Sequence, residues 1–250
     1  MTPQPEHVAQ VYADSYFKDG GAGYPDYLGE SDLLIAHGAR YGRLLRRYMQ
    51  PETVLDVGAA AGFILKGLQT AGWTGMGLEP NAAMAAYARD QMDMNVQAGA
   101  LEDFESQQQF TLVSMIQVIA HFFDVHKALA HAARVTRPGG YWLIESWNKD
   151  SWMARMFGVN WHEYSPPSVL RWFAPADLTH LVSRYGFKPV AQGRPGKWLN
   201  GAHVKSLVGY KLSGTWMQNP ADVMFRLMPD NLPIPYPAFD LFWGLYQKQP

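Results

Sequence analysis

One stretch limits what this chain can fold into more than any other, Thr53-Val-Leu-Asp-Val-Gly-Ala-Ala-Ala-Gly-Phe-Ile-Leu65. Its apolar run predicts a buried β-strand, and the small residues that follow predict a sharp turn into a helix. Glycine and alanine at such a turn let a ligand approach the backbone at the helix N-terminus. A second strand is expected to end at Glu79, where an acid is the usual partner of two ribose hydroxyls. Together these features predict a site for a nucleoside-containing cofactor.

The spacing within this turn decides which cofactor is expected. A dinucleotide site needs G-x-G-x-x-G, and laid on Gly58 that pattern falls on Ala60 and Phe63. The chain instead has Asp56-Val-Gly58-Ala-Ala60-Ala-Gly62. This resembles the D-x-G-x-G-x-G signature of class I S-adenosylmethionine-dependent methyltransferases, with Ala60 replacing the middle glycine. The extra methyl group is tolerable provided that the backbone angle φ of Ala60 is negative.

Three further segments resemble one branch of that family, the small-molecule methyltransferases related to ubiquinone-biosynthesis O-methyltransferases. They are FTLVSMIQVIAHFFD at 110–124, RVTRPGG at 134–140 and HEYSPPSVLRWF at 162–173. Thr111 and Ala120 stand where the family has acids, so the roles of those acids are not carried over. The resemblance covers roughly residues 50–193 and concerns the fold and the cofactor more than the acceptor.

The order of predicted elements indicates an α/β fold. A helix is expected to begin at Ser31-Asp32 and to run to about Met49. After it come alternating strands, near 53–58, 74–79, 95–99, 110–117, 140–146 and 188–193, and helices, near 61–71, 81–93, 124–136 and 174–185. Such alternation favours a mostly parallel sheet with helices on both faces. The resemblance implies a Rossmann-like sheet of seven strands that ends with an antiparallel pair.

We expect four regions along the chain. Residues 1–50 would form an N-terminal lid and helix, and 51–194 the cofactor-binding core. Residues 195–238 form a long, aromatic and methionine-rich insertion or cap, and 239–250 supply the final strand of the core sheet. The insertion could be an adaptable wall for the acceptor, an oligomer interface or plain lid packing, and the sequence leaves these readings open.

The resemblance implies a binding site for S-adenosylmethionine, with S-adenosylhomocysteine as product. Asp56, Gly58, Ala60 and Gly62 would shape the methionine pocket. Glu79 would bind the ribose hydroxyls through both carboxylate oxygens. Further candidates are Pro80, Asn81, Leu101, Glu102, Gln117 and Val118, together with the lid tyrosines Tyr16, Tyr24 and Tyr27.

Several of these candidates have a structural alternative. Asn81 either contacts the ligand or caps the helix that it starts. Glu102 either accepts a hydrogen bond from the adenine amine or is an ordinary exposed acid. Gln117 follows the fourth strand, where open α/β sheets bind ligands, and suits the methionine end of the cofactor. The tyrosines either cover the sulfonium, or simply pack as amphipathic aromatics.

A general base is optional, because the sulfonium already activates the methyl group. His121 is the first candidate, since it follows the fourth strand at the cofactor-facing edge and histidine titrates near neutrality. His162, beyond the fifth strand, is the second. The alternative for either histidine is a purely structural role.

The amino-acid composition limits the kinds of partner and site that we expect for this chain. The 21 basic and 22 acidic side chains nearly cancel, which argues against a nucleic-acid partner. The absence of cysteine excludes disulfides, thiolate zinc sites and cysteine nucleophiles. A polar start and the lack of a long apolar run favour a cytoplasmic protein that does not enter membranes. No metal site is predicted, and a homodimer is left open.

The leading hypothesis is therefore a methyltransferase that acts on an oxygen, nitrogen or carbon atom of a small organic metabolite. A tRNA- or protein-modifying methyltransferase is disfavoured by the charge balance. A catalytically silent methyltransferase-like binding domain would be expected to have a decayed cofactor motif, and only Ala60 hints at that. A nucleotide-dependent oxidoreductase is disfavoured by the glycine spacing.

Overall fold

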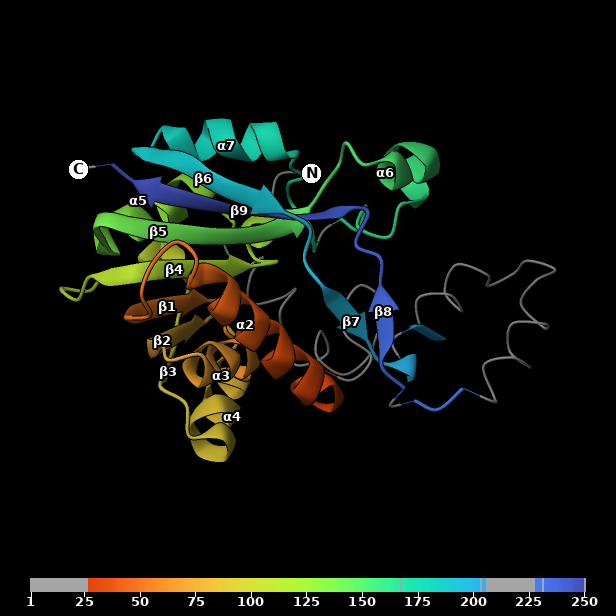
Figure 1. The fold of residues 1–250 in the computed structure, drawn as a ribbon, viewed down its shortest axis with the longest axis horizontal. Coiled ribbons are helices and arrows are strands. Elements are labelled where there is room, and N and C mark those ends of the chain that lie inside the picture. Colours follow the sequence, from red (N-terminus) through yellow and green to blue (C-terminus); the bar gives the residue numbers. More distant parts are fainter. Residues whose placement is uncertain (1–26, 167, 203, 206–227, 231, 250) are drawn as a thin grey trace.

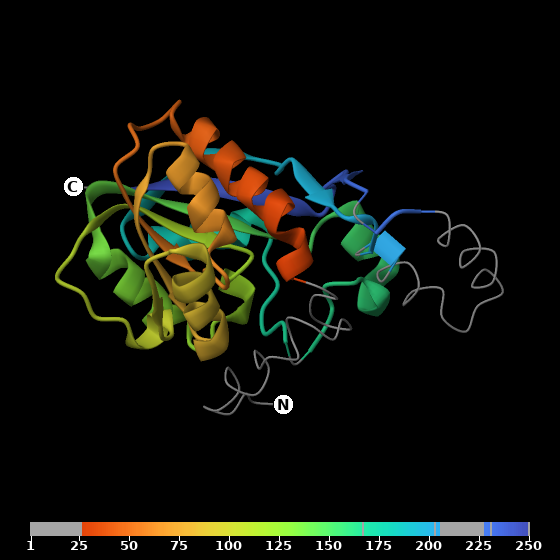
Figure 2. The same cartoon turned by 90° about the horizontal axis from the view of Figure 1, so that it is seen from below.

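A computed structural model describes residues 27–166, 168–202, 204–205, 228–230 and 232–249. Its main feature is a seven-stranded sheet with the order β3-β2-β1-β4-β5-β9-β6 and helices on both faces (Figures 1 and 2). Strand β9 runs antiparallel to both β5 and β6, whereas the pairings among β1 to β5 are parallel. The predicted Rossmann-like fold is confirmed, and β9 lies between β5 and β6 in the sheet.

The strands lie close to the predicted positions. They are β1 Thr53–Val57, β2 Thr74–Glu79, β3 Val96–Ala98, β4 Phe110–Ile116, β5 Thr136–Trp147, β6 Phe187–Gly193 and β9 Leu241–Lys248. The start of β5 differs from the prediction, which placed a turn at 137–140 before the strand. Thr136 instead already pairs with Phe110, and the register then shifts before Leu112 pairs with Tyr141. The strand therefore begins early and carries an irregularity where the Pro-Gly-Gly sequence lies.

The helices also follow the predicted order. They are α2 Ser31–Leu45, α3 Phe63–Thr70, α4 Ala82–Met92, α5 Val125–Val135, α6 Trp152–Phe157 and α7 Pro175–Ser183. Short 3-10 helices are η2 Leu28–Glu30, η3 Leu101–Asp103, η4 Ile119–His121 and η5 Gly158–Asn160. Helix α2 ends at Leu45 instead of Met49, and Glu30, not Ser31, occupies its N-cap position because η2 leads directly into it.

Each face of the sheet has its own hydrophobic core. On one face, α5 and α7 pack over residues such as Phe110 and Trp142. On the other, α2, α3 and α4 pack over residues such as Val54 and Leu143 (Figure 2). Because both faces are covered, polar groups of the strands are accessible mainly at the ends of the sheet, which is where a ligand must bind.

A two-stranded ribbon stands beyond the carboxyl ends of the parallel strands (Figure 1). Its strands, β7 Lys197–Leu199 and β8 Ile234–Tyr236, are antiparallel and belong to the predicted insertion at 195–238. Residues 206–227 of that insertion lie outside the described part of the chain. The ribbon thus brings residues from the insertion to the edge of the sheet that holds the cofactor motif.

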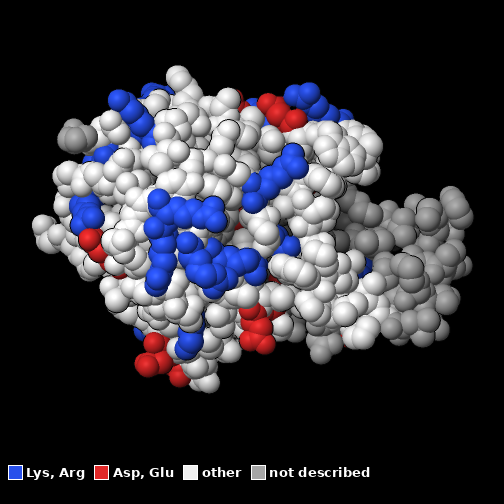
Figure 3. Space-filling model, viewed as in Figure 1, with Lys and Arg blue, Asp and Glu red and all other residues white. Residues whose placement is uncertain are grey.

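Although the net charge of the chain is close to zero, part of its surface is basic. Figure 3 shows Lys and Arg side chains gathered over the C-terminal part of α2, where Arg43, Arg46 and Arg47 are exposed. Within the described residues, no helix is long and apolar enough to cross a membrane.

Helices α2 and α3 cross with their backbones in close contact, because each has glycine at the crossing. A Cβ atom on Gly38 would lie 2.2 Å from the carbonyl oxygen of Ile64, and one on Gly67 would lie 2.1 Å from that of Ile35. Both distances are far below van der Waals contact, so neither position has room for a side chain. This crossing holds α2 against the core and thereby positions the residues that α2 contributes to the site.

We therefore expect Gly67→Ala to lower the free energy of unfolding by about 1–3 kcal/mol through overpacking. The helix preference of alanine over glycine, worth about 1 kcal/mol, acts in the opposite direction. Urea unfolding measures the difference, and Gln69→Ala, at an exposed position of the same helix, is the control, with an expected change within about 0.5 kcal/mol. Unchanged or higher stability of Gly67→Ala would contradict the close crossing.

Candidate active site

The turn after β1 is left-handed at three alternate residues. The φ angles are 66° at Gly58, 46° at Ala60 and 80° at Gly62. The turn is tied to β2, because the amides of Gly58 and Ala59 both donate to the carbonyl oxygen of Leu78, at 2.8 and 3.1 Å. A Cβ atom on Gly58 would lie 2.7 Å from Val118, so that position requires glycine for space as well as for φ. The turn leads directly into the N-terminus of α3, the part of a helix that favours a ligand with negative charge.

The condition that φ of Ala60 be negative is wrong. A left-handed φ costs a residue with a Cβ atom about 1–2 kcal/mol, so Ala60 is strained. A hydrogen bond of 2.8 Å from the Ala60 amide to Oε2 of Glu79 holds it in this conformation. The methyl group is also buried in a cluster with Tyr27, Phe63 and Met84. The signature thus keeps its left-handed geometry without its middle glycine.

Two buried acids lie beside this turn. Glu79 accepts hydrogen bonds from the amides of Ala60, at 2.8 Å, and of Asn81, at 2.7 Å. Burial raises the pKa of Glu79 to about 7, although both bonds act to lower it. Asp56 accepts from the Ser114 hydroxyl at 2.6 Å. Burial raises the pKa of Asp56 to about 7 as well; the Ser114 bond opposes this, and the charge of Glu79 adds to it. Ribose hydroxyls that bind at Glu79 would have to donate to the carboxylate lone pairs that these two backbone amides do not use.

The residues after Glu79 start the next helix. The side chain of Asn81 accepts a hydrogen bond from the Met84 amide at 2.9 Å and so caps α4, which is the structural alternative considered above. Pro80 beside it is exposed. Asn81 also makes an interaction besides this helix cap.

The residues predicted to contact adenine are more buried than expected. Leu101 is 1% exposed and Glu102 is 8% exposed, both in η3. One oxygen of Glu102 accepts from the Phe123 amide at 3.0 Å, and burial raises the pKa of the group. The alternative of an ordinary exposed acid is therefore wrong. A contact of Glu102 with adenine stays a prediction.

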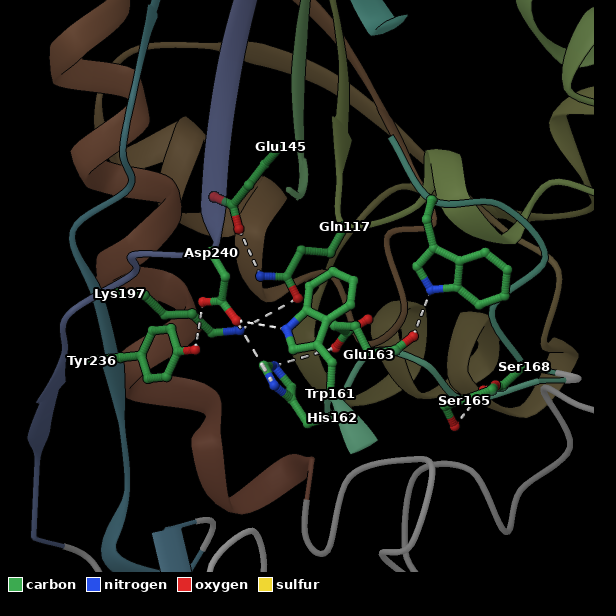
Figure 4. Close-up of polar contacts among 11 residues, drawn as sticks. Gln117, Glu145, Trp161, His162, Glu163, Ser165, Ser168, Lys197, Tyr236 and Asp240 are labelled. Atoms are coloured by element: carbon green, nitrogen blue, oxygen red, sulfur yellow. Dashed lines mark hydrogen bonds and ion pairs between the residues drawn. The ribbon is translucent and has the colours of Figure 1, made fainter. Parts of the chain in front are cut away.

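A buried polar cluster at the ends of β4 and β5 was missed by the sequence analysis (Figure 4). Its centre is Glu145, which is fully buried. Oε1 of Glu145 accepts from the side-chain amide of Gln117 at 2.6 Å, and Oε2 accepts from His37 at 2.9 Å and from the Tyr41 hydroxyl at 2.5 Å. Burial acts to raise the pKa of Glu145, but the charge and hydrogen bond of His37, the charge of Lys197 and the bond from Tyr41 lower it to about 2. Glu145 is therefore an anion.

Gln117, predicted at the methionine end, is held firmly by this cluster. Its φ of 58° is unusual for a residue with a side chain. Its amide nitrogen is taken by Glu145, and its amide oxygen accepts from Lys197 at 3.3 Å. Val118, the next residue, covers Gly58. The cluster thus orients the segment between β4 and η4.

A second polar cluster surrounds His162 (Figure 4). Asp240 is fully buried and accepts from Nε1 of Trp161 at 2.9 Å and from the Tyr236 hydroxyl at 2.7 Å. Nδ1 of His162 lies 3.8 Å from Asp240, and its Nε2 lies 3.8 Å from Glu163. Burial raises the pKa of Glu163 to about 8, the charge of Lys197 lowers it and that of Asp240 raises it. An imidazole beside the buried Asp240 is suited to accept a proton.

His121, the first candidate base, has a different setting. It lies in η4 and is partly buried, and its Nδ1 lies 2.9 Å from the carbonyl oxygen of Ser168. Nδ1 must carry hydrogen to bond to a carbonyl oxygen.

Of the three lid tyrosines, only Tyr27 lies within the described residues. It is buried, and its ring stacks on Phe63 with centroids 5.5 Å apart. This places Tyr27 in the cluster beside the Ala60 turn. Tyr16 and Tyr24 lie outside the described part of the chain. Among the described side chains, no group of three His, Asp or Glu is arranged to hold a metal ion.

The sheet order and the turn at its carboxyl edge define a class I S-adenosylmethionine-dependent methyltransferase. Residues 36–192 match the family model of a methyltransferase domain, and the chain belongs to that family. A ubiquinone biosynthesis O-methyltransferase from Bradyrhizobium sp. (strain ORS 278) is 27% identical over 53% of this chain and 51% of its own length. Another from Rhodopseudomonas palustris (strain BisB5) is 24% identical over 72% of this chain and 71% of its own. The chain spans about half the length of the first of these curated relatives.

Solved structures support the fold. A SAM-dependent methyltransferase from Archaeoglobus fulgidus has a TM-score of 0.58 and 15% identity, covering 89% of this chain and 99% of that chain. The [4+2]-cyclase SpnF has a TM-score of 0.54 and 12% identity, with 84% and 80% covered. Two such different names on one fold show that the acceptor must be inferred from the site.

The strain at Ala60 leads to a prediction about stability. We expect Ala60→Gly to raise the free energy of unfolding by up to about 1 kcal/mol, because glycine accepts the left-handed φ. The matched control is Ala61→Gly, at a buried neighbour without positive φ, which we expect to lose about 1 kcal/mol. Thermal and urea unfolding measure both variants. If Ala60→Gly were destabilised as much as Ala61→Gly, the left-handed conformation of Ala60 would be wrong.

Proposed function

We propose that this protein transfers a methyl group from S-adenosylmethionine to a hydroxyl group of a small organic molecule by in-line displacement. The observation that carries the proposal is the turn after β1, whose left-handed residues lead into the N-terminus of α3 beside the acid that ends β2. Family membership supports the cofactor, and the names of the relatives support oxygen as the acceptor atom.

In this proposal the binding residues divide among the three parts of the cofactor. The turn from Asp56 to Gly62 holds the methionine portion, with Gln117 and Val118 closing it from the side of β4. Glu79 takes the ribose hydroxyls. Leu101 and Glu102 line the site for the adenine ring. Tyr27, through its packing on Phe63, supports the turn from outside.

When bound, S-adenosylmethionine supplies an activated methyl group on a sulfonium. The residues of this chain must exclude water, align the acceptor and remove its proton. Methyl transfer to a hydroxyl leaves a proton to be taken up, so a base near the acceptor is useful. The site lies at the carboxyl ends of β4 and β5, where both polar clusters face the ribbon of β7 and β8 (Figure 4).

We assign the base to His162 in preference to His121. The carboxylate of Asp240, 3.8 Å from Nδ1, would stabilise the imidazolium that forms on proton uptake, and Glu163 lies 3.8 Å from Nε2. His162 also lies edge-on to Trp147 at the end of β5, with ring centroids 4.6 Å apart. Trp147 therefore fixes the orientation of the ring that takes the proton. This reverses the order of the two candidates given by the sequence.

The cofactor assignment is tested by calorimetric titration with S-adenosylhomocysteine and, separately, with NAD. We expect S-adenosylhomocysteine alone to bind, and Glu79→Gln to weaken it about 10- to 100-fold, because hydrogen bonds to a carboxylate are lost. Glu105→Gln, which removes an exposed acid, is the control and should leave affinity unchanged. Binding of NAD alone would indicate an oxidoreductase, and binding of neither would indicate a silent domain.

The base is tested by methyl transfer from labelled S-adenosylmethionine to a panel of small hydroxylated aromatic compounds. With the acceptor that this panel identifies, we expect His162→Gln to lower turnover about 10²- to 10⁴-fold without changing the affinity for S-adenosylhomocysteine. His121→Gln, the matched substitution, should lower it less than about tenfold. The opposite ranking would return the role to His121.

A further inference from the structure

Lys197 is the cation at the acceptor side of this site. It begins β7, so the ribbon carries it to the carboxyl ends of β4 and β5 (Figure 4). Its ammonium donates to the amide oxygen of Gln117 at 3.3 Å and lies 5.2 Å from the centroid of the Trp147 ring. The side chain is only partly exposed. Lys197 is thus fixed at two points, one polar and one aromatic.

Glu145 and Glu163 lie near enough for the charge of Lys197 to lower their pKa values, but these acids and Asp240 are directed to other partners. Glu145 is taken by His37, Tyr41 and Gln117. The two oxygens of Asp240 accept from Trp161 and Tyr236, and Glu163 faces His162. Within the described residues, Lys197 forms no ion pair. An ammonium has three donors, and the structure accounts for one of them, which leaves two for a ligand.

The surroundings of Lys197 suit a flat ligand. Trp147 presents its ring to the ammonium, and the rings of His162 and Tyr236 lie edge-on to it, with centroids 4.6 and 6.1 Å away. Aromatic rings favour such edge and stacked arrangements with one another. A ligand ring that carries an anion toward Lys197 would therefore meet both a cation and an aromatic wall.

We propose that Lys197 binds the carboxylate of an aromatic hydroxy acid, which is the methyl acceptor of this site. This inference rests on the proposed function, because it names the acceptor class of that same reaction. The ion pair would set the acceptor against Trp147 with its hydroxyl toward His162. The methionine carboxylate of the cofactor offers the same chemistry from another source, and the experiment separates the two.

The experiment measures binding to the protein saturated with S-adenosylhomocysteine, so it does not depend on turnover. The probes are 2-hydroxybenzoate and its neutral analogue 2-hydroxybenzamide. We expect the wild-type protein to bind the carboxylate at least about tenfold more tightly than the amide. Lys197→Met should abolish this preference, and Lys197→Arg should restore most of it. Lys188→Met, which removes an exposed charge at the other end of the sheet, should leave the preference unchanged.

A second titration identifies the source of the carboxylate. S-adenosylhomocysteine has an amino-acid carboxylate, and 5′-methylthioadenosine lacks it. If Lys197 serves the acceptor, Lys197→Met should leave the affinities for both nucleosides unchanged. A loss of about tenfold confined to S-adenosylhomocysteine would assign Lys197 to the cofactor and overturn the acceptor class.

Two other outcomes are also decisive. Equal binding of the benzoate and the benzamide, or no binding of either, would overturn the inference while leaving the cofactor assignment intact. Failure of the wild-type protein to bind S-adenosylhomocysteine would overturn the proposed function itself. Circular dichroism and thermal unfolding of each variant would show that a lost preference does not reflect a lost fold.

Discussion

The site depends on the hydrogen bonds that the buried carboxylate of Glu145 accepts. A carboxylate without water is tolerated only when its oxygens are paired, and here the donors come from α2 and from the end of β4. Helix α2 can supply His37 and Tyr41 because its crossing with α3 has no side chains in the way. Through Gln117 the same carboxylate reaches Lys197 on the ribbon. One buried charge thus joins a helix that precedes the sheet, the middle of the sheet and the segment inserted before β9.

The cofactor turn shows how a motif can vary without losing its geometry. Glycine at position 60 would adopt a left-handed φ at little cost, whereas alanine must be held there. The holding group is Glu79, the acid expected to bind ribose, which accepts the Ala60 amide. Packing of the methyl group beside Phe63 adds to this. The residue that departs from the signature is therefore compensated by the acid at the end of the next strand.

Features that depend on neighbouring residues could be predicted from the sequence, and those that depend on distant pairing could not. The strands that carry Asp56 and Glu79 follow from local periodicity and from one strand–turn–helix unit. His37 and Glu145 are 108 residues apart, and nothing local marks either as buried and paired. A clue existed, since His37 and Tyr41 are four residues apart and share a helix face. The proposed preference for His162 over His121 also rests on a distant pairing, because Asp240 approaches His162 only when β9 is in place.

The place of β9 in the sheet has a consequence for how the molecule is assembled. It lies between β5 and β6, yet the chain emerges from the ribosome with β6 first and β9 only after residues 194–240. Until then β5 has an unpaired edge and β6 has no neighbour in the sheet, and such edges are prone to pair with other chains. Asp240, which directly precedes β9, reaches His162 at the same moment. The strand that completes the sheet is thus also the one that brings Asp240 to His162.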